Sequence, residues 1–215
     1  MNLVNLKKDL IVFVAHLDDF ECACYGYVFK HHEEYDKIKI ITASTWDEKR
    51  VIWEENLSMF PSNILEKIDD INLGFPQREL QTNFDLMKDK FYNKINFQKR
   101  FDILTHDEGD CHSDHKALAV AAHGLFKYCN RYVTIYSPSG AHFNPNYFIG
   151  LDEETYNLKK TTLDKYDITK DQSYTKLGYY LHSEEHYNIG RAYVLENYVF
   201  DDYKNYEIYK ILKWL

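Results

Sequence analysis

The pattern of apolar and polar residues along the chain predicts strands that alternate with helices. Residues 10–15 are six apolar residues in a row, which suits a strand buried on both faces of a parallel sheet. Similar runs separated by helical patterns indicate βαβ units. The predicted strands cover residues 10–15, 37–43, 68–73, 101–105 and 132–137, and the predicted helices cover residues 22–34, 47–60, 92–100, 114–126 and 152–166.

These elements predict one α/β domain over residues 1–215, with a Rossmann-like, mostly parallel sheet flanked by helices. No repeat, low-complexity tract or linker divides the chain, and a chain of this length can bury a substantial core. The pattern weakens beyond Ser137, where Pro138, Gly140 and Pro145 indicate a long loop. The last forty or so residues match no clear element.

Composition and charge exclude several classes of protein. Hydrophobic residues make up 45% and charged residues 28% of the chain, and no apolar run reaches the roughly 18 residues of a membrane helix. The lysines near the start precede only six apolar residues, which argues against a signal peptide. A net charge of −8 argues against nucleic acid as a partner. The four cysteines lack the density of a disulfide framework, so a cytoplasmic location is expected.

Two clusters of histidine and aspartate directly follow predicted strands. His16, Asp18 and Asp19 come after residues 10–15, and the segment THDEGDCHSDH, residues 105–115, follows the run that begins at Phe101. Ligands of open α/β sheets bind at the carboxyl ends of the strands. Imidazole and carboxylate are zinc ligands, and a catalytic zinc takes three from the protein so that water holds the fourth position. His-x-x-Asp supplies two, and the second cluster is the expected source of the third.

At these clusters the chain resembles the LmbE-like, or PIG-L-type, zinc deacetylases, which remove N-acetyl groups from amino sugars. The family motif A-H-P-D-D-x-E is matched by AHLDDFE at residues 15–21, and D-x-H-P-D-H is matched by DCHSDH at residues 110–115. Leu17 and Ser113 replace the two prolines. A weaker likeness, FNPNYF at residues 143–148 followed by Lys159, Lys160 and Gln172, extends the resemblance to about residues 10–172.

The resemblance implies one zinc ion per chain, held by His16, Asp19 and His115. It assigns Asp18 as the general base, because only one of two adjacent carboxylates easily faces the metal. The spacing of His112 from His115 suggests a protonated imidazole that stabilises the oxyanion and then protonates the leaving amine. Asp114 is expected to orient one of the histidines. Asp18 and His112 each have an alternative as outer partners that orient a ligand.

The function implied is a zinc-dependent amidohydrolase that removes an N-acetyl group from an N-acetylglucosamine-type amino sugar or conjugate. Asn144 and Tyr147, in the loop of residues 138–149, are candidates to grip the sugar, and the alternative is that this loop packs against the sheet. Two other functions stay open, a phosphoesterase that holds two metal ions and a non-catalytic module that binds metal or carbohydrate. Another alternative is a structural zinc site that uses Cys22, Cys24 and Cys111. The oligomeric state is left open.

Overall fold

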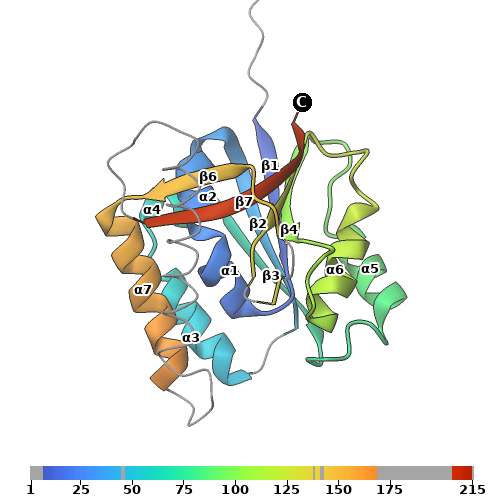
Figure 1. The fold of residues 1–215 in the computed structure, drawn as a ribbon, viewed down its shortest axis with the longest axis horizontal. Coiled ribbons are helices and arrows are strands. Elements are labelled where there is room, and N and C mark those ends of the chain that lie inside the picture. The colour runs from blue at the N-terminus through green and yellow to red at the C-terminus, as the bar shows by residue number, and fades with distance from the viewer. Residues whose placement is uncertain (1–6, 45–46, 138, 141–142, 169–204, 215) are drawn as a thin grey trace, which may run out of the picture.

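Seven strands of the described chain form one sheet in the order β3-β2-β1-β4-β5-β7-β6 (Figure 1). The structure is a computed structural model that describes residues 7–44, 47–137, 139–140, 143–168 and 205–214. The strands are β1 (Lys8–Val14), β2 (Tyr35–Ser44), β3 (Ile68–Phe75), β4 (Phe101–His106), β5 (Arg131–Ile135), β6 (Tyr147–Leu151) and β7 (Asn205–Trp214). Strands β1 to β5 pair in parallel, and β7 is antiparallel to both β5 and β6. The predicted α/β fold with a mostly parallel sheet is confirmed.

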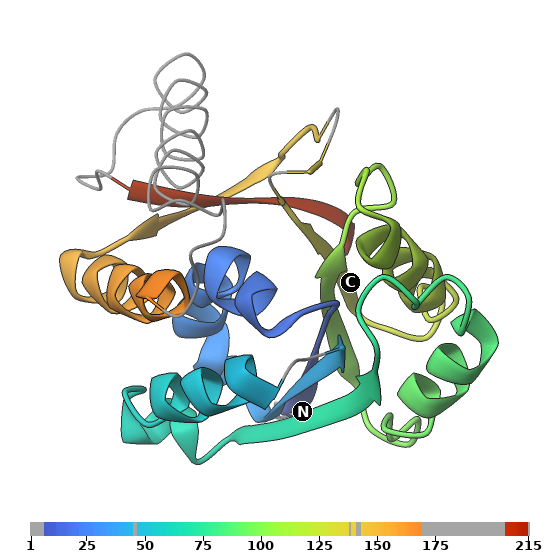
Figure 2. The same cartoon turned by 90° about the horizontal axis from the view of Figure 1, so that it is seen from below.

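Helices cover both faces of this sheet. Figures 1 and 2 show α1, α2, α3 and α7 on one face and α5 and α6 on the other. The helices are α1 (Leu17–Ala23), α2 (Tyr25–His31), the 3₁₀ helix η1 (His32–Glu34), α3 (Asp47–Leu57), α4 (Ser62–Leu65), α5 (Phe84–Tyr92), α6 (Ser113–His123) and α7 (Glu153–Ile168). This layered arrangement leaves the ends of the strands as the place where loops from distant parts of the sequence meet.

The central strand β1 contributes to two separate hydrophobic cores. Val12 and Val14 pack into the core on the side of α1 and α2, and Ile11 and Phe13 pack into the core on the side of α5 and α6. Successive side chains of a strand point to opposite faces of a sheet, so an uninterrupted apolar run fills both cores at once. The residues that directly follow β1 are therefore held by the most buried part of the fold.

The helix predicted for residues 22–34 is corrected in two ways. Helix α1 begins earlier, at Leu17, and the backbone N–H of His16 donates to Asp19 Oδ2 at 2.7 Å, one half of a capping box. The chain leaves helical geometry at Cys24, whose φ is −120° and ψ is −10°, and α2 follows. Asp18 and Asp19 therefore lie in the first turn of a helix and not in an open loop.

The helix predicted for residues 92–100 is wrong. The helix in this region is α5, and it ends at Tyr92. Met87 and Phe91 lie one turn apart on α5 and are fully buried, which anchors that helix on the sheet. Within residues 93–100 only Ile95 is buried. That polar segment therefore has no apolar face to hold a helix against the core.

Two further differences concern the loops around the predicted site. The helix predicted to begin at residue 114 is α6, which begins at Ser113, and its N-cap residue is His112, whose Nδ1 accepts the backbone N–H of Asp114 at 3.3 Å. The long loop predicted for residues 138–149 ends in strand β6, which begins at Tyr147. Strand β6 pairs with β7 from the far end of the chain, a contact that no local pattern signals.

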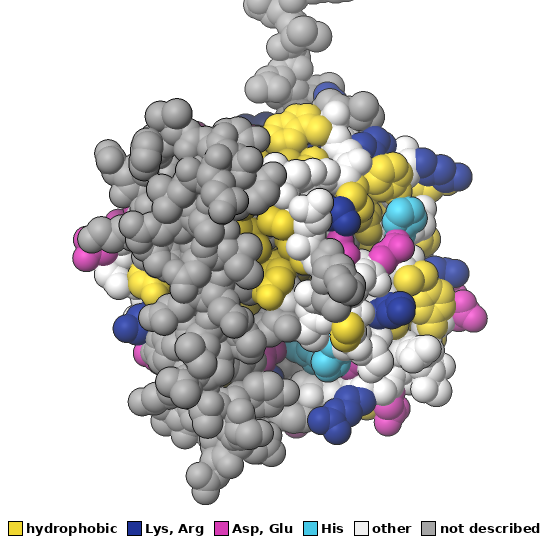
Figure 3. Space-filling model, in the orientation of Figure 1, with side chains coloured by type: hydrophobic (Ala, Val, Ile, Leu, Met, Phe, Trp, Pro, Cys, Tyr) yellow, Lys and Arg dark blue, Asp and Glu magenta, His cyan; other side chains and the backbone are white. Residues whose placement is uncertain are grey.

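The exposed surface mixes side chains of every kind. On the described part of the face in Figure 3, basic side chains are scattered among acidic and hydrophobic ones. The more exposed of the large hydrophobic side chains include Val51 on α3 and Tyr128 in the turn beyond α6. Within the described ranges, no helix has both the length and the apolar content that crossing a bilayer requires.

Candidate metal centre

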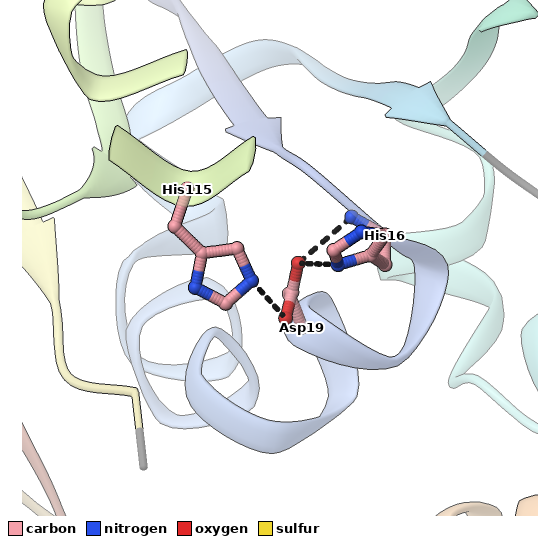
Figure 4. Close-up of side chains that lie close together, drawn as sticks. All are labelled: His16, Asp19 and His115. Carbon is pink, nitrogen blue, oxygen red and sulfur yellow. Dashed lines mark hydrogen bonds and ion pairs between the residues drawn. The ribbon is translucent and has the colours of Figure 1, made fainter. Parts of the chain in front are cut away.

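The two motif segments meet where β1 and β4 end. These strands pair in parallel, with Phe13 opposite Thr105, so the residues that follow them leave the sheet at the same edge. Residue His16 directly precedes α1, and His115 lies in the first turns of α6. Figure 4 shows the carboxylate of Asp19 between the imidazole rings of His16 and His115. The sequence prediction that both clusters contribute to one site agrees with this geometry.

Three side chains form a compact donor set. Asp19 Oδ2 lies 3.3 Å from His16 Nδ1, and Asp19 Oδ1 lies 3.3 Å from His115 Nε2. One donor atom from each residue lies within 4.8 Å of the others. His16 and His115 are 8% and 6% exposed, so the set is largely shielded from bulk water. These are the three residues for which the family resemblance implies metal binding.

Each histidine of this set has an acidic partner on its other ring nitrogen. His16 Nε2 lies 3.3 Å from Asp114 Oδ2, and His115 Nδ1 lies 2.9 Å from Asp110 Oδ2. Such partners fix the tautomer and the orientation of a ligand histidine. They leave His16 Nδ1 and His115 Nε2 to face Asp19. Asp114 thus orients a histidine, as expected, and the histidine is His16.

Loops that are distant in sequence hold these acidic partners. Asp114 accepts the backbone N–H groups of Arg78 at 2.6 Å and Leu80 at 3.3 Å, and Arg78 has a positive φ of 65°, a conformation that is costly for a residue other than glycine. Asp110 accepts hydroxyl hydrogen bonds from Ser137 and from Ser139, the latter at 2.6 Å. The segments after β3 and β5 therefore complete the surroundings of the donor set.

The charges of the three side chains depend strongly on one another. Burial alone would raise the pKa of Asp19, but His115, His106 and His16 hold it well below the usual range. Burial would lower the pKa of His16 and of His115, but Asp19 and the outer carboxylates raise these values to about 9 and about 10. Without a cation between them, both rings are protonated at neutral pH. A divalent cation can replace these two protons.

The donor set fits a zinc ion. Imidazole nitrogen and carboxylate oxygen are zinc ligands, and three protein ligands leave one tetrahedral position open. The structure supplies two buried histidines and one partly buried aspartate, each held by a further hydrogen bond. Each group of described residues close enough to share an ion consists of histidine and aspartate, without cysteine. The alternative site at Cys22, Cys24 and Cys111 therefore has no support among the described residues.

Asp18 and His112 flank the donor set. Asp18 is 8% exposed, and its Oδ2 lies 2.6 Å from the Nζ of Lys49 on α3. The ring centroid of His112 lies 4.4 Å from that of His115 and 5.2 Å from that of His16. Burial, together with the proximity of these two histidines, lowers the pKa of His112. This lowering favours the neutral ring in the metal-free chain, and the protonated form expected from the spacing stays a prediction.

Sequence reasoning missed His106 and Lys49. His106 is the last residue of β4, is fully buried, and its Nε2 lies 3.3 Å from Asp19 Oδ2. Burial and the nearby His115 lower its pKa to about 4. His106 belongs to the cluster of residues 105–115, and its position directly after an apolar run could have identified it from the sequence. No sequence pattern identifies Lys49, because it lies within a charged run at the start of α3.

The contacts of Tyr147 are with residues outside the donor set. The Tyr147 hydroxyl lies 2.8 Å from His31 Nε2, and its ring packs near Tyr209 and Trp214. Asn144 is exposed. A contact of either residue with substrate stays a prediction. Gln172, which the sequence likeness includes, lies outside the described residues.

Comparisons with known proteins identify the fold. No protein-family model and no curated protein matches the sequence. A conserved protein from Thermus thermophilus is 18% identical with a TM-score of 0.66, covering 94% of each chain. The N,N'-diacetylchitobiose deacetylase from Pyrococcus horikoshii is 14% identical with a TM-score of 0.67, covering 99% of this chain and 87% of that one.

A third solved structure shows that this fold is compatible with another reaction. GalB from Pseudomonas putida, a 4-carboxy-2-hydroxymuconate hydratase, is 15% identical with a TM-score of 0.62, covering 95% of this chain and 96% of its own. At this level of identity the likeness establishes the fold, and function has to be argued from the site. The chain has the α/β fold of these proteins, the deacetylase among them, as its resemblance to the LmbE-like deacetylases predicted.

Proposed function

We propose that this chain is a zinc-dependent N-deacetylase of the LmbE-like family that acts on an N-acetylglucosamine-type amino sugar or its conjugate. The observation that carries the proposal is the convergence of both family motifs on one buried centre. His16, Asp19 and His115 face one another there, and Asp18 and His112 lie beside them. A non-catalytic metal site would need only the three ligands.

The chemistry proposed is hydrolysis of an acetamide. A zinc ion bound at this centre supplies a coordinated water of lowered pKa and a Lewis acid for the carbonyl. Asp18 accepts the proton of the attacking water at its carboxylate, and Lys49 holds that carboxylate through the 2.6 Å contact. The water oxygen becomes bonded to the acetyl carbon, the C–N bond breaks, and Asp18 returns the proton to the leaving amine. Acetate and a free amino sugar are the products.

His112 acts in this scheme as a neutral hydrogen-bond donor. Its Nδ1 accepts the backbone N–H of Asp114, so the proton of the neutral ring is on Nε2. That N–H stabilises the oxyanion that forms when the carbonyl is attacked. The lowered pKa of His112 belongs to the metal-free chain, so protonation of the amine by His112, as its spacing suggested, stays an alternative to return of the proton by Asp18.

The choice of an amino sugar rests on the motif resemblance and on one structural neighbour. The Pyrococcus horikoshii protein of the same fold is named for N,N'-diacetylchitobiose, which is an N-acetylated sugar. We extend this substrate class to the present chain, with the carrier of the sugar left open. The four unpaired cysteines fit a reducing compartment, so we retain the cytoplasm and a single domain of residues 1–215 as part of the proposal.

The test is acetate release by the zinc-loaded chain from a panel of N-acetylated amino sugars and their conjugates. The panel includes an acetyl ester, a phosphoester and an unsaturated hydroxy acid as competing substrate classes. We expect acetate and a free amine in equal amounts, and one zinc ion per chain. Turnover of the phosphoester with two ions per chain would instead establish the phosphoesterase. Addition of water to the unsaturated acid, without acetate release, would place the chain with GalB.

A further inference from the structure

A buried histidine outside the motif ligands contacts most of the metal centre. His106 is 0% exposed at the end of β4. Its Nε2 lies 3.2 Å from the backbone nitrogen of Ala15 and 3.3 Å from Asp19 Oδ2. Its ring lies flat against that of His115, with centroids 3.9 Å apart and planes 16° from parallel. One side chain thus touches two of the three proposed ligands and the residue before the third.

These contacts favour a role for His106 as an outer partner of the ligands over a role as a ligand itself. His106 is not part of the donor set of His16, Asp19 and His115, although it belongs to a second group of possible donors with Asp110 and His115. The Nε2 of His106 accepts the backbone N–H of Ala15 at 3.2 Å, so its lone pair is already used. Outer groups of this kind orient ligands and change metal affinity.

We propose that His106 is a positioning residue of the metal centre, which holds the backbone that leads into His16 by accepting the N–H of Ala15 at Nε2 and fixes the ring of His115 through stacking. This inference rests on the metal centre of the proposed function. It adds a residue on β4 that ties the sheet to ligands on α1 and α6. The rigid end of a strand thereby controls the relative position of two helices.

The polar side chain of His106 indicates a role beyond packing. Its Nδ1 is buried without a hydrogen-bond partner, which costs stability. A phenylalanine would occupy the same place and stack on His115 without that cost. We therefore expect the ring to contribute through Nε2, which accepts the N–H of Ala15.

The test compares two substitutions that separate the ring from the nitrogen. His106→Phe keeps a stacking ring and removes Nε2, whereas His106→Gln keeps a polar end and removes the ring. Zinc affinity is measured by competition with a chromophoric chelator, and the melting temperature of the metal-free protein is measured in parallel. We expect His106→Phe to weaken zinc binding by roughly 10- to 100-fold, with partial recovery in His106→Gln. The Co²⁺-loaded forms should differ in their visible absorption, which reports ligand geometry.

His31→Phe is the matched control. His31 is also a buried histidine, and it contacts Glu34 and Tyr147, which are not part of the centre. We expect this control to lower the melting temperature and to leave zinc affinity and the Co²⁺ spectrum unchanged. Wild-type affinity and spectrum in His106→Phe would overturn the inference while the proposed function stands. Equal weakening in the Phe and Gln variants would overturn the role of the nitrogen, and a wild-type chain that binds no zinc would overturn the metal centre itself.

Discussion

Lys49 Nζ lies 2.6 Å from Asp18 Oδ2, which joins the first turn of α1 to the start of α3. Both side chains are largely shielded, with 19% of Lys49 and 11% of Asp18 exposed. A charge-assisted hydrogen bond in such a setting restricts the carboxylate to one orientation. The proposed general base is therefore held from a helix that carries none of the metal ligands.

The first prediction concerns this ion pair. Lys49→Met should lower the rate of acetate release by roughly 10- to 100-fold, because a displaced base no longer faces the attacking water. Metal content should stay at the wild-type value, since Lys49 is not one of the proposed ligands. Lys165→Met is the control, because Lys165 pairs with the exposed Glu55 on the surface. A wild-type rate for Lys49→Met, measured at full zinc occupancy, would show that the ion pair does not orient the base.

Asp18→Asn tests the base directly. The amide cannot accept the proton of water, so the rate should fall by on the order of 10² to 10⁴. Zinc content and melting temperature should be close to those of the wild type. If turnover were almost normal in a fully loaded variant, Asp18 would have to be an outer partner of the metal centre and another group would be the base.

Replacing a ligand should remove the metal. His16→Ala, Asp19→Ala and His115→Ala should each lower the zinc content measured by elemental analysis, because two donors bind far less tightly than three. A chelator should abolish activity, and added zinc or cobalt should restore it. His123→Ala serves as the control, because His123 lies on the surface of α6 beside Glu108. One ion per chain in all three ligand variants would refute the assigned donor set.

Zinc binding should release protons and depend on pH. In the metal-free chain the pKa of His16 is raised to about 9 and that of His115 to about 10, by Asp19 and the outer carboxylates against the effect of burial. Zinc requires both rings neutral. Calorimetry at pH 7.5 in buffers of different ionisation enthalpy should show one proton released from each histidine, and zinc affinity should rise up to about pH 10.

The same raised pKa values should make the stability of the metal-free protein depend on pH. Their contribution is complete below the unfolded value of about 6.5 and is lost as the pH rises through 9 and 10. The melting temperature of the metal-free protein should therefore fall between pH 7 and pH 10. In His115→Gln this decline should be smaller, because one of the two raised groups is gone. Identical pH profiles for the two proteins would contradict the assignment of His115.

Substitution of the two candidate substrate residues should have different effects on stability. Tyr147→Ala removes the hydroxyl at His31 and the packing near Tyr209 and Trp214, so it should destabilise the fold by about 1–3 kcal/mol. Asn144 is exposed, and Asn144→Ala should leave stability unchanged. A raised Michaelis constant in Asn144→Ala, at constant zinc content and melting temperature, would support a sugar contact. An unchanged constant would remove Asn144 from the site.

The sequence predicts those parts of the fold and of the site that depend on local pattern. The apolar run of residues 10–15 marks the strand and the position of His16, and the cluster at residues 105–115 marks the second loop. Parallel pairing of β1 with β4 then brings the two clusters together. Strand β7 could not be placed in this way, because its pairing with β5 and β6 is a contact between distant segments.

The outer contacts of the site depend on tertiary structure and escape the same reasoning. Asp114 is held by backbone groups of Arg78 and Leu80, and backbone N–H groups carry no sequence signature. Lys49 reaches Asp18 from another helix, and its place in a charged run resembles any solvated helix face. His106 belongs to the second cluster of the sequence, but its stacking against His115 results from the packing of α6 on β4, which the sequence pattern does not predict.

Because β1 is held by one core on each side, its folding does not depend on metal for support. His16 lies two residues beyond β1, whose buried amide hydrogens are expected to exchange with solvent only when the sheet opens. A metal ion arriving at this centre therefore meets side chains that are already in place. Its binding energy is available for holding the ion and not for ordering the chain, which distinguishes this scaffold from small domains that fold only around their metal.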